Sequence, residues 1–92
     1  MYLLAYKQFI KRKAMNSNDF TQLNEARKIE AVLDATFLAD RLIDEHYVCL
    51  YNLDNFYVEV FFDDRTHLIS KFRAFEHTLF VLPYLDDVEI AV

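Results

Sequence analysis

The 92-residue chain contains no glycine. Phosphate-binding loops, dinucleotide-binding fingerprints and nucleophile elbows need glycine where the backbone turns sharply or closely approaches a ligand. None of these motifs is therefore present in its usual form. This absence excludes the commonest site designs for nucleotide binding and for serine-based hydrolysis.

Cysteine and long apolar runs are equally scarce. Cys49 is the single cysteine, so no disulfide can form within the chain. This fits a reducing compartment, and we expect a cytoplasmic protein. No apolar run approaches the roughly 18 to 20 residues of a membrane span. Near the N-terminus the basic residues follow the apolar ones, which is the reverse of a secretory signal.

Acidic residues dominate the charge, which is −5 in total. Residues 1–14 carry four basic and no acidic side chains (+4), whereas the other residues carry six basic and fifteen acidic ones (−9). An acidic body repels phosphate backbones, so we expect no nucleic-acid partner. Residues 1–15 are interpreted as a basic N-terminal extension. Both a short amphipathic helix, with Leu3, Tyr6, Phe9 and Ile10 on one side, and a disordered tail remain open for it.

Residues 16–92 are rich enough in core-forming side chains for a single domain, because the chain is 54% hydrophobic and 16% aromatic. N-cap candidates at 16–19 precede apolar residues that recur every three or four positions. These apolar residues are Phe20, Leu23, Ala26, Ile29 and Leu33. The pattern predicts one amphipathic helix of about four turns.

Four runs of strand length follow, each rich in β-branched and aromatic residues. They read TFLADRLI, HYVCLYNL, FYVEVFF and HLISKFRAF. The links between them are short and polar, which predicts a four-stranded antiparallel meander. The last stretch, TLFVLPYLDDVEIAV, predicts a short C-terminal helical turn with Pro83 near a helix start. The expected fold class is α+β.

A two-residue turn at Asp54-Asn55 would place Leu53 opposite Phe56 and define two sheet faces. One face is almost wholly apolar and should pack against the helix. It carries Tyr47, Cys49, Tyr51, Leu53, Phe56, Val58, Val60 and Phe62, with Leu68, Ser70 and Phe72 expected beside them. The other face is mixed and carries Val48, Leu50, Asn52, Tyr57, Glu59 and Phe61.

Glu59 is the one carboxylate on the mixed face. A cross-strand ion pair with Lys71 or Arg73 on an open sheet face explains it most simply. The alternative is a partly desolvated acid that acts in catalysis or binds a ligand. The predicted face holds no second acid that would complete a catalytic pair.

The mixed face is more apolar than a solvated sheet should be, so something is expected to cover it. Three candidates could pack on this face: the C-terminal segment, a second copy of the chain, or a partner protein. The residues of the mixed face that could bind a ligand or partner are Val48, Leu50, Tyr57, Glu59, Phe61, Lys71 and Arg73.

The other side chains that could bind a metal or act as a nucleophile fit ordinary structural roles. Asp63, Asp64 and His67 share one predicted turn, and residues 44–46 another. Neither group has the further spaced ligands of a metal site, so we expect no metal and no cofactor. Cys49 is predicted to lie on the core face, where a small buried thiol is common.

The segments FLADR at 37–41, LYNLDNFYVEV at 50–60 and KFRAF at 71–75, followed by LPYLDDVEI, resemble a group of short uncharacterised bacterial proteins. The resemblance covers most of the chain after the first helix and excludes residues 1–14. Those proteins tend to have glycine in the central turn, where this chain has Asn55. The resemblance implies a helix followed by a meander, no assigned activity and no catalytic residues.

Three functional hypotheses follow. The leading one is a non-enzymatic interaction or regulatory module that uses the mixed face to bind a protein partner or a second copy, as a homodimer. The second is a binder of a small-molecule ligand, or a simple enzyme, with its site around Glu59 and Arg73. The third is a binder of anionic surfaces through residues 7–13.

Overall fold

The computed structural model describes residues 13–85. An antiparallel sheet in the order β1-β2-β3-β4 forms its centre. Its strands are β1 (Thr36–Ile43), β2 (His46–Leu53), β3 (Phe56–Asp63) and β4 (Ile69–Phe75). Two helices, α2 (Ser17–Thr21) and α3 (Glu25–Leu33), precede the sheet, and η1 (Thr78–Val81) and α4 (Leu82–Leu85) follow it. The α+β class and the meander are confirmed.

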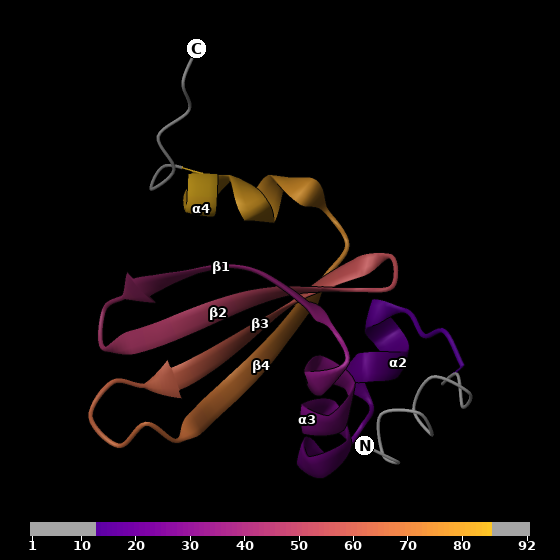
Figure 1. The fold of residues 1–92 in the computed structure, drawn as a ribbon, viewed down its shortest axis with the longest axis horizontal. Coiled ribbons are helices and arrows are strands. Elements are labelled where there is room, and N and C mark those ends of the chain that lie inside the picture. Colours follow the sequence, from indigo (N-terminus) through magenta and orange to yellow (C-terminus); the bar gives the residue numbers. More distant parts are fainter. Residues whose placement is uncertain (1–12, 86–92) are drawn as a thin grey trace, which may run out of the picture.

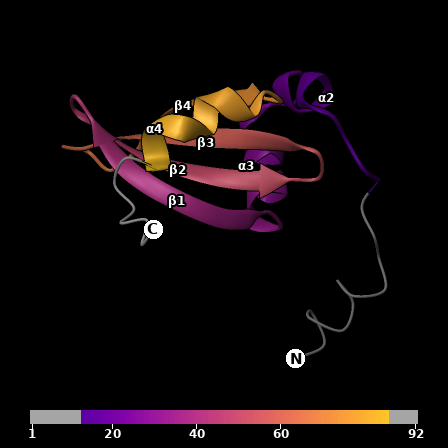
Figure 2. The ribbon, with the colours of Figure 1, turned by 90° about the horizontal axis from the view of Figure 1, so that it is seen from above.

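The sheet has a helical layer on each side (Figure 1). Helices α2 and α3 lie on one side, which we call the first face, and α4 lies on the opposite side, the second face. Seen from above, the segment of η1 and α4 lies over the strands (Figure 2). The predicted extension, residues 1–15, lies outside the described residues except for its last three.

The single four-turn helix expected from the apolar spacing is divided in two. Asn16 caps α2, and its side chain accepts a hydrogen bond from the Asp19 N–H at 2.8 Å. Asn24 then caps α3 by accepting from the Arg27 N–H at 2.9 Å. A capping asparagine takes an extended backbone that ends one helix and starts another. The break turns Phe20 into the sheet, where it is only 1% exposed.

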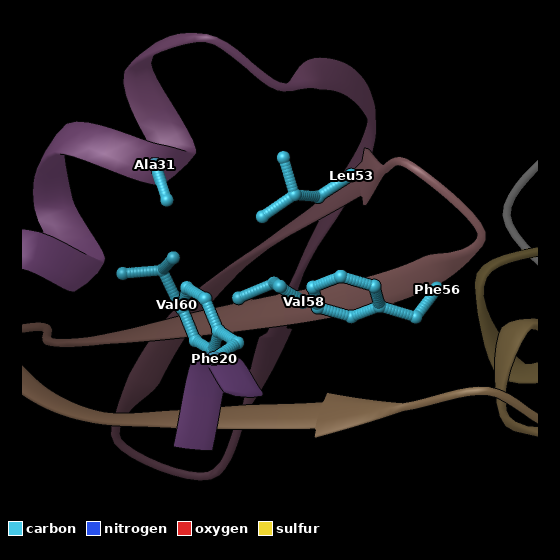
Figure 3. Packing of buried hydrophobic residues seen from close by; sticks show 6 residues of the cluster. All are labelled: Phe20, Ala31, Leu53, Phe56, Val58 and Val60. Atoms are coloured by element: carbon cyan, nitrogen blue, oxygen red, sulfur yellow. The ribbon is translucent and has the colours of Figure 1, made fainter. Parts of the chain in front are cut away.

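The first core lies between α2, α3 and the first face (Figure 3). Phe20 and Ala31 from the helices meet Leu53, Phe56, Val58 and Val60 from the central strands. Phe20 packs against the rings of Phe56 and Phe72, with centroids 5.9 and 6.0 Å away. The predicted division of strand residues between the two faces is confirmed here, including the pairing of Leu53 with Phe56.

The register of β4 differs from the prediction. Phe61 pairs with Lys71 but Phe62 pairs with Ile69, so Ser70 is an extra residue in β4. Such a bulge shifts the alternation by one position. Ile69 therefore packs on the first core beside Phe72, whereas Leu68 and Ser70, which were expected there, are exposed.

Three non-glycine residues in the described chain have positive φ: Asp44 (53°), Asp54 (54°) and His67 (63°). The left-handed region costs an L-residue about 1–2 kcal/mol, which glycine avoids. Asp44→Gly is therefore expected to raise the free energy of unfolding by about 0.5–1 kcal/mol, after the extra flexibility of the unfolded chain is subtracted. Urea denaturation measures this change.

Glu45 occupies the same turn without a positive φ and supplies the matched control. Glu45→Gly is expected to lower the free energy of unfolding by about 0.4–1 kcal/mol. Equal losses in both variants would contradict the role given to Asp44.

Candidate functional site

Glu59 lies on the second face of β3, opposite Leu50 of β2 and Arg73 of β4. Its position in the register is as predicted, but its environment is not. The residue is only 4% exposed, so the prediction of an open sheet face around it is wrong. The C-terminal segment, η1 and α4, covers it.

The Glu59 carboxylate is paired within the chain. The Tyr84 O–H donates to Oε2 at 2.6 Å, and Arg73 Nε lies 3.3 Å from Oε1. Oε1 has no aligned hydrogen bond, so the Arg73 contact is an ion pair held by charge alone. Burial, and then the hydrogen bond to Glu59, raise the pKa of the Tyr84 phenol. The predicted partner Arg73 is confirmed, and Tyr84 is a partner that sequence reasoning missed.

Two arginines contact aromatic rings of the C-terminal segment. Arg41 lies over the Tyr84 ring, with its guanidinium carbon 5.0 Å from the centroid. Arg73 lies over the Phe80 and Phe75 rings, at 4.6 and 5.2 Å. Together with the Glu59 bond, these contacts explain why a segment of only eight residues stays on the sheet.

The other candidate residues on the second face form a second core. Val48 and Leu50 are completely buried, and Phe61 and Phe75 almost so, beneath Tyr84 and Val81. Tyr57 is half-buried and stacks on Phe75. Lys71 is exposed at the edge, with its ammonium 4.5 Å from the centre of the Phe61 ring. The structure thus brings all seven predicted residues to one face. Val48, Leu50, Glu59 and Phe61 are buried there, Tyr57 is half-buried, and Lys71 and Arg73 stay exposed at the edge of the sheet.

Accessible apolar surface lies instead on the first face, near the β1–β2 and β3–β4 turns. A hollow of about 310 Å³ lies there, lined by Tyr47, Cys49, Phe62, Asp64 and His67. Tyr47 pairs across the sheet with Leu42 on one side and Phe62 on the other. Leu42 is 69% and Tyr47 38% exposed. We call Leu42, Tyr47, Phe62 and the hollow beside them the open patch.

Element lengths show why this end is uncovered. Helix α3 runs across the strands rather than along them (Figure 1). An α-helix is only about 10–12 Å wide, whereas an eight-residue strand extends about 26 Å. Together α2 and α3 cover the half of the first face near the Asp54 turn and leave the other half open (Figure 1). The sequence contained this signal, because one short helical region cannot cover four strands of this length.

The environment of the open patch favours the protonated forms of Tyr47 and Cys49. The Tyr47 O–H donates to Asp40 Oδ2, and this bond is the main reason why the pKa of the Tyr47 phenol is raised. Burial raises the pKa of the Cys49 thiol. A neutral thiol is a poor nucleophile, so Cys49 is not activated. No group of three His, Cys, Asp or Glu residues within 13–85 is placed to hold a metal ion.

The raised pKa of Cys49 predicts slow alkylation. Iodoacetamide should react with the native chain at least about tenfold more slowly than with the urea-unfolded chain near pH 7.5, since burial and the scarcity of thiolate act together. The alkylation rate of the native chain should also rise at a higher pH than that of the unfolded chain, because the pKa of the thiol is raised. Cys49 is the single cysteine, so mass spectrometry follows it without background. Equal rates in the two states would contradict this environment.

No protein family, curated protein or solved structure matches the chain. These comparisons therefore do not bear on the resemblance to short bacterial proteins. Among residues 13–85, no helix has the length and apolar character to cross a membrane.

Proposed function

We propose that this protein is a small non-enzymatic interaction module that binds a protein partner through the open patch. The observation that carries the proposal is the exposure of Leu42 and Tyr47 around an apolar hollow. Exposed apolar surface that is continuous across strands is a common mark of a binding site. Cys49 is a free thiol, which fits a cytoplasmic module.

The proposal moves the partner surface from the second face to the first. Val48, Leu50 and Phe61 already pack against the chain's own Tyr84, so they have little surface to offer a partner. The same argument weakens the alternative of a ligand or catalytic site around Glu59 and Arg73. Both carboxylate oxygens there already contact Tyr84 or Arg73.

Affinity capture from an extract of the source cells tests the proposal, with wild type compared to Leu42→Lys. A lysine at this position places a charge on the apolar surface of the open patch, and we expect it to weaken partner retention by about tenfold or more. Leu79→Lys is the matched control, because Leu79 is similarly exposed but lies on η1. It should retain the partner.

Thermal unfolding of both variants checks that the fold is intact. Equal retention of every captured protein by Leu42→Lys and wild type would overturn the proposal. So would the loss of the same proteins from both lysine variants, since the effect would then belong to added charge alone.

A further inference from the structure

Carboxylates lie beside the open patch. The turn between β1 and β2 lies beside the turn between β3 and β4, because the Asp64 N–H donates to the Glu45 carbonyl at 2.9 Å. Asp40 borders the patch through its bond from Tyr47. The acidic residues of this region are Asp40, Asp44, Glu45, Asp63 and Asp64, and its basic residues are Arg41 and Arg65.

Asp63 is held in its charged form. Its Oδ1 accepts the backbone N–H groups of Arg65 at 2.8 Å and Thr66 at 3.0 Å. These bonds lower the pKa of the carboxyl, with the Thr66 bond the largest contribution. A group whose pKa is lowered stays ionised at neutral pH. Asp63 does not itself line the hollow, where the carboxylate is that of Asp64, with Asp40 beside Tyr47.

An apolar hollow with a negative rim fits an occupant of matching chemistry. Apolar or aromatic side chains would fill the hollow, while lysine or arginine would meet the carboxylates. A segment with both properties is present in this chain. Residues 1–14 contain Leu3, Tyr6, Phe9 and Ile10 together with Lys7, Lys11, Arg12 and Lys13, and no acidic residue.

The geometry favours a second copy as the source of that segment. The Met15 N–H is bound to Asp54 Oδ2 at 2.9 Å, which attaches the start of the described chain to the turn after β2. Tyr47 lies seven residues before Asp54, about 23 Å away along β2. Helix α3 packs on the first face between the two positions. A second copy meets no such obstacle.

We propose that the basic segment of one copy, within residues 3–12, binds the open patch of a second copy. Reciprocal exchange of the two segments would close a two-fold dimer. This inference rests on the proposed use of the open patch for binding, and it names the partner. It predicts self-association that depends on charge and on the apolar surface together.

Sedimentation velocity of the full chain, up to about 100 µM, tests this. We expect a dimer at about 50 mM salt and a dissociation constant at least about tenfold weaker at about 500 mM, because salt screens the charge pairs. The triple variant Lys7→Glu, Lys11→Glu, Arg12→Glu should be monomeric. Asp64→Lys in the hollow should weaken the dimer by about tenfold.

Two further variants make the test specific. Glu30→Lys introduces the same charge change on an exposed position of α3 and should leave the dimer unaffected. Combining Asp64→Lys with the triple N-terminal reversal should restore part of the association, since the charges are then exchanged. Near- and far-ultraviolet circular dichroism confirms that each variant is folded.

A chain that stays monomeric at both salt concentrations would overturn the inference. So would a dimer that survives the N-terminal reversal. If that surviving dimer is lost in Leu42→Lys, the open patch binds a different part of the second copy, and the proposed function stands without this inference. If the chain is monomeric, the affinity capture that compares wild type with Leu42→Lys still tests the proposed function independently.

Discussion

Tyr84→Ala is expected to lower the free energy of unfolding by about 3–5 kcal/mol. The side chain is 2% exposed and fills the centre of the second core, so its removal leaves a cavity above Val48 and Leu50. It also deprives the buried Glu59 carboxylate of its hydrogen-bond donor. Urea denaturation followed by circular dichroism measures the loss.

Tyr84→Phe separates the two contributions. It keeps the ring and removes only the hydroxyl, so we expect a loss of about 1–3 kcal/mol from the Glu59 oxygen that loses its partner. Leu85→Ala, in the same helix but exposed, should change the free energy by no more than about 0.5 kcal/mol. If Tyr84→Ala is as mild as Leu85→Ala, the C-terminal segment contributes nothing to the core.

Phe20→Ala is the second change with a large expected effect, again about 3–5 kcal/mol. Phe20 is almost completely buried, and its ring contacts those of Phe56 and Phe72. It is the buried side chain of α2, so its loss should also release this short helix from β4. The unfolding transition of the purified variant reports the effect.

Leu33→Ala provides the control for Phe20. Leu33 belongs to the same predicted apolar stripe but is largely exposed at the end of α3. Its truncation should cost no more than about 0.5 kcal/mol. Equal effects of the two substitutions would show that the stripe packs as one uninterrupted helix, contrary to the division at Asn24.

Local patterns were sufficient for much of the fold. The alternation along β2 and β3 predicted which side chains share a face, because side chains in a strand point to opposite sides in turn. The two-residue link at Asp54-Asn55 then determined the register of those strands, and Leu53 pairs with Phe56 as predicted. Short links also determined the order of the strands, since they leave only antiparallel neighbours.

Local patterns failed where two signals competed. Asn24 fits the polar side of a continuous helix and also fits an N-cap, and the periodicity of the apolar residues does not distinguish the two roles. The link before β4 is longer than two residues, so it does not define the register. The bulge at Ser70, and with it the positions of Leu68 and Ile69, could not be predicted.

Contacts between distant residues decided the candidate site. Leu79, Phe80, Leu82 and Tyr84 are all large and apolar or aromatic, so the sequence does not tell which of them faces the sheet. In the folded chain Tyr84 faces it and bonds to Glu59, 25 residues away, which buries the second face. The uncovered end of the first face likewise results from where α3 packs. Strand pairing and turns depend on neighbouring residues, whereas burial depends on every element that packs on a face, and only the complete tertiary structure contains that information.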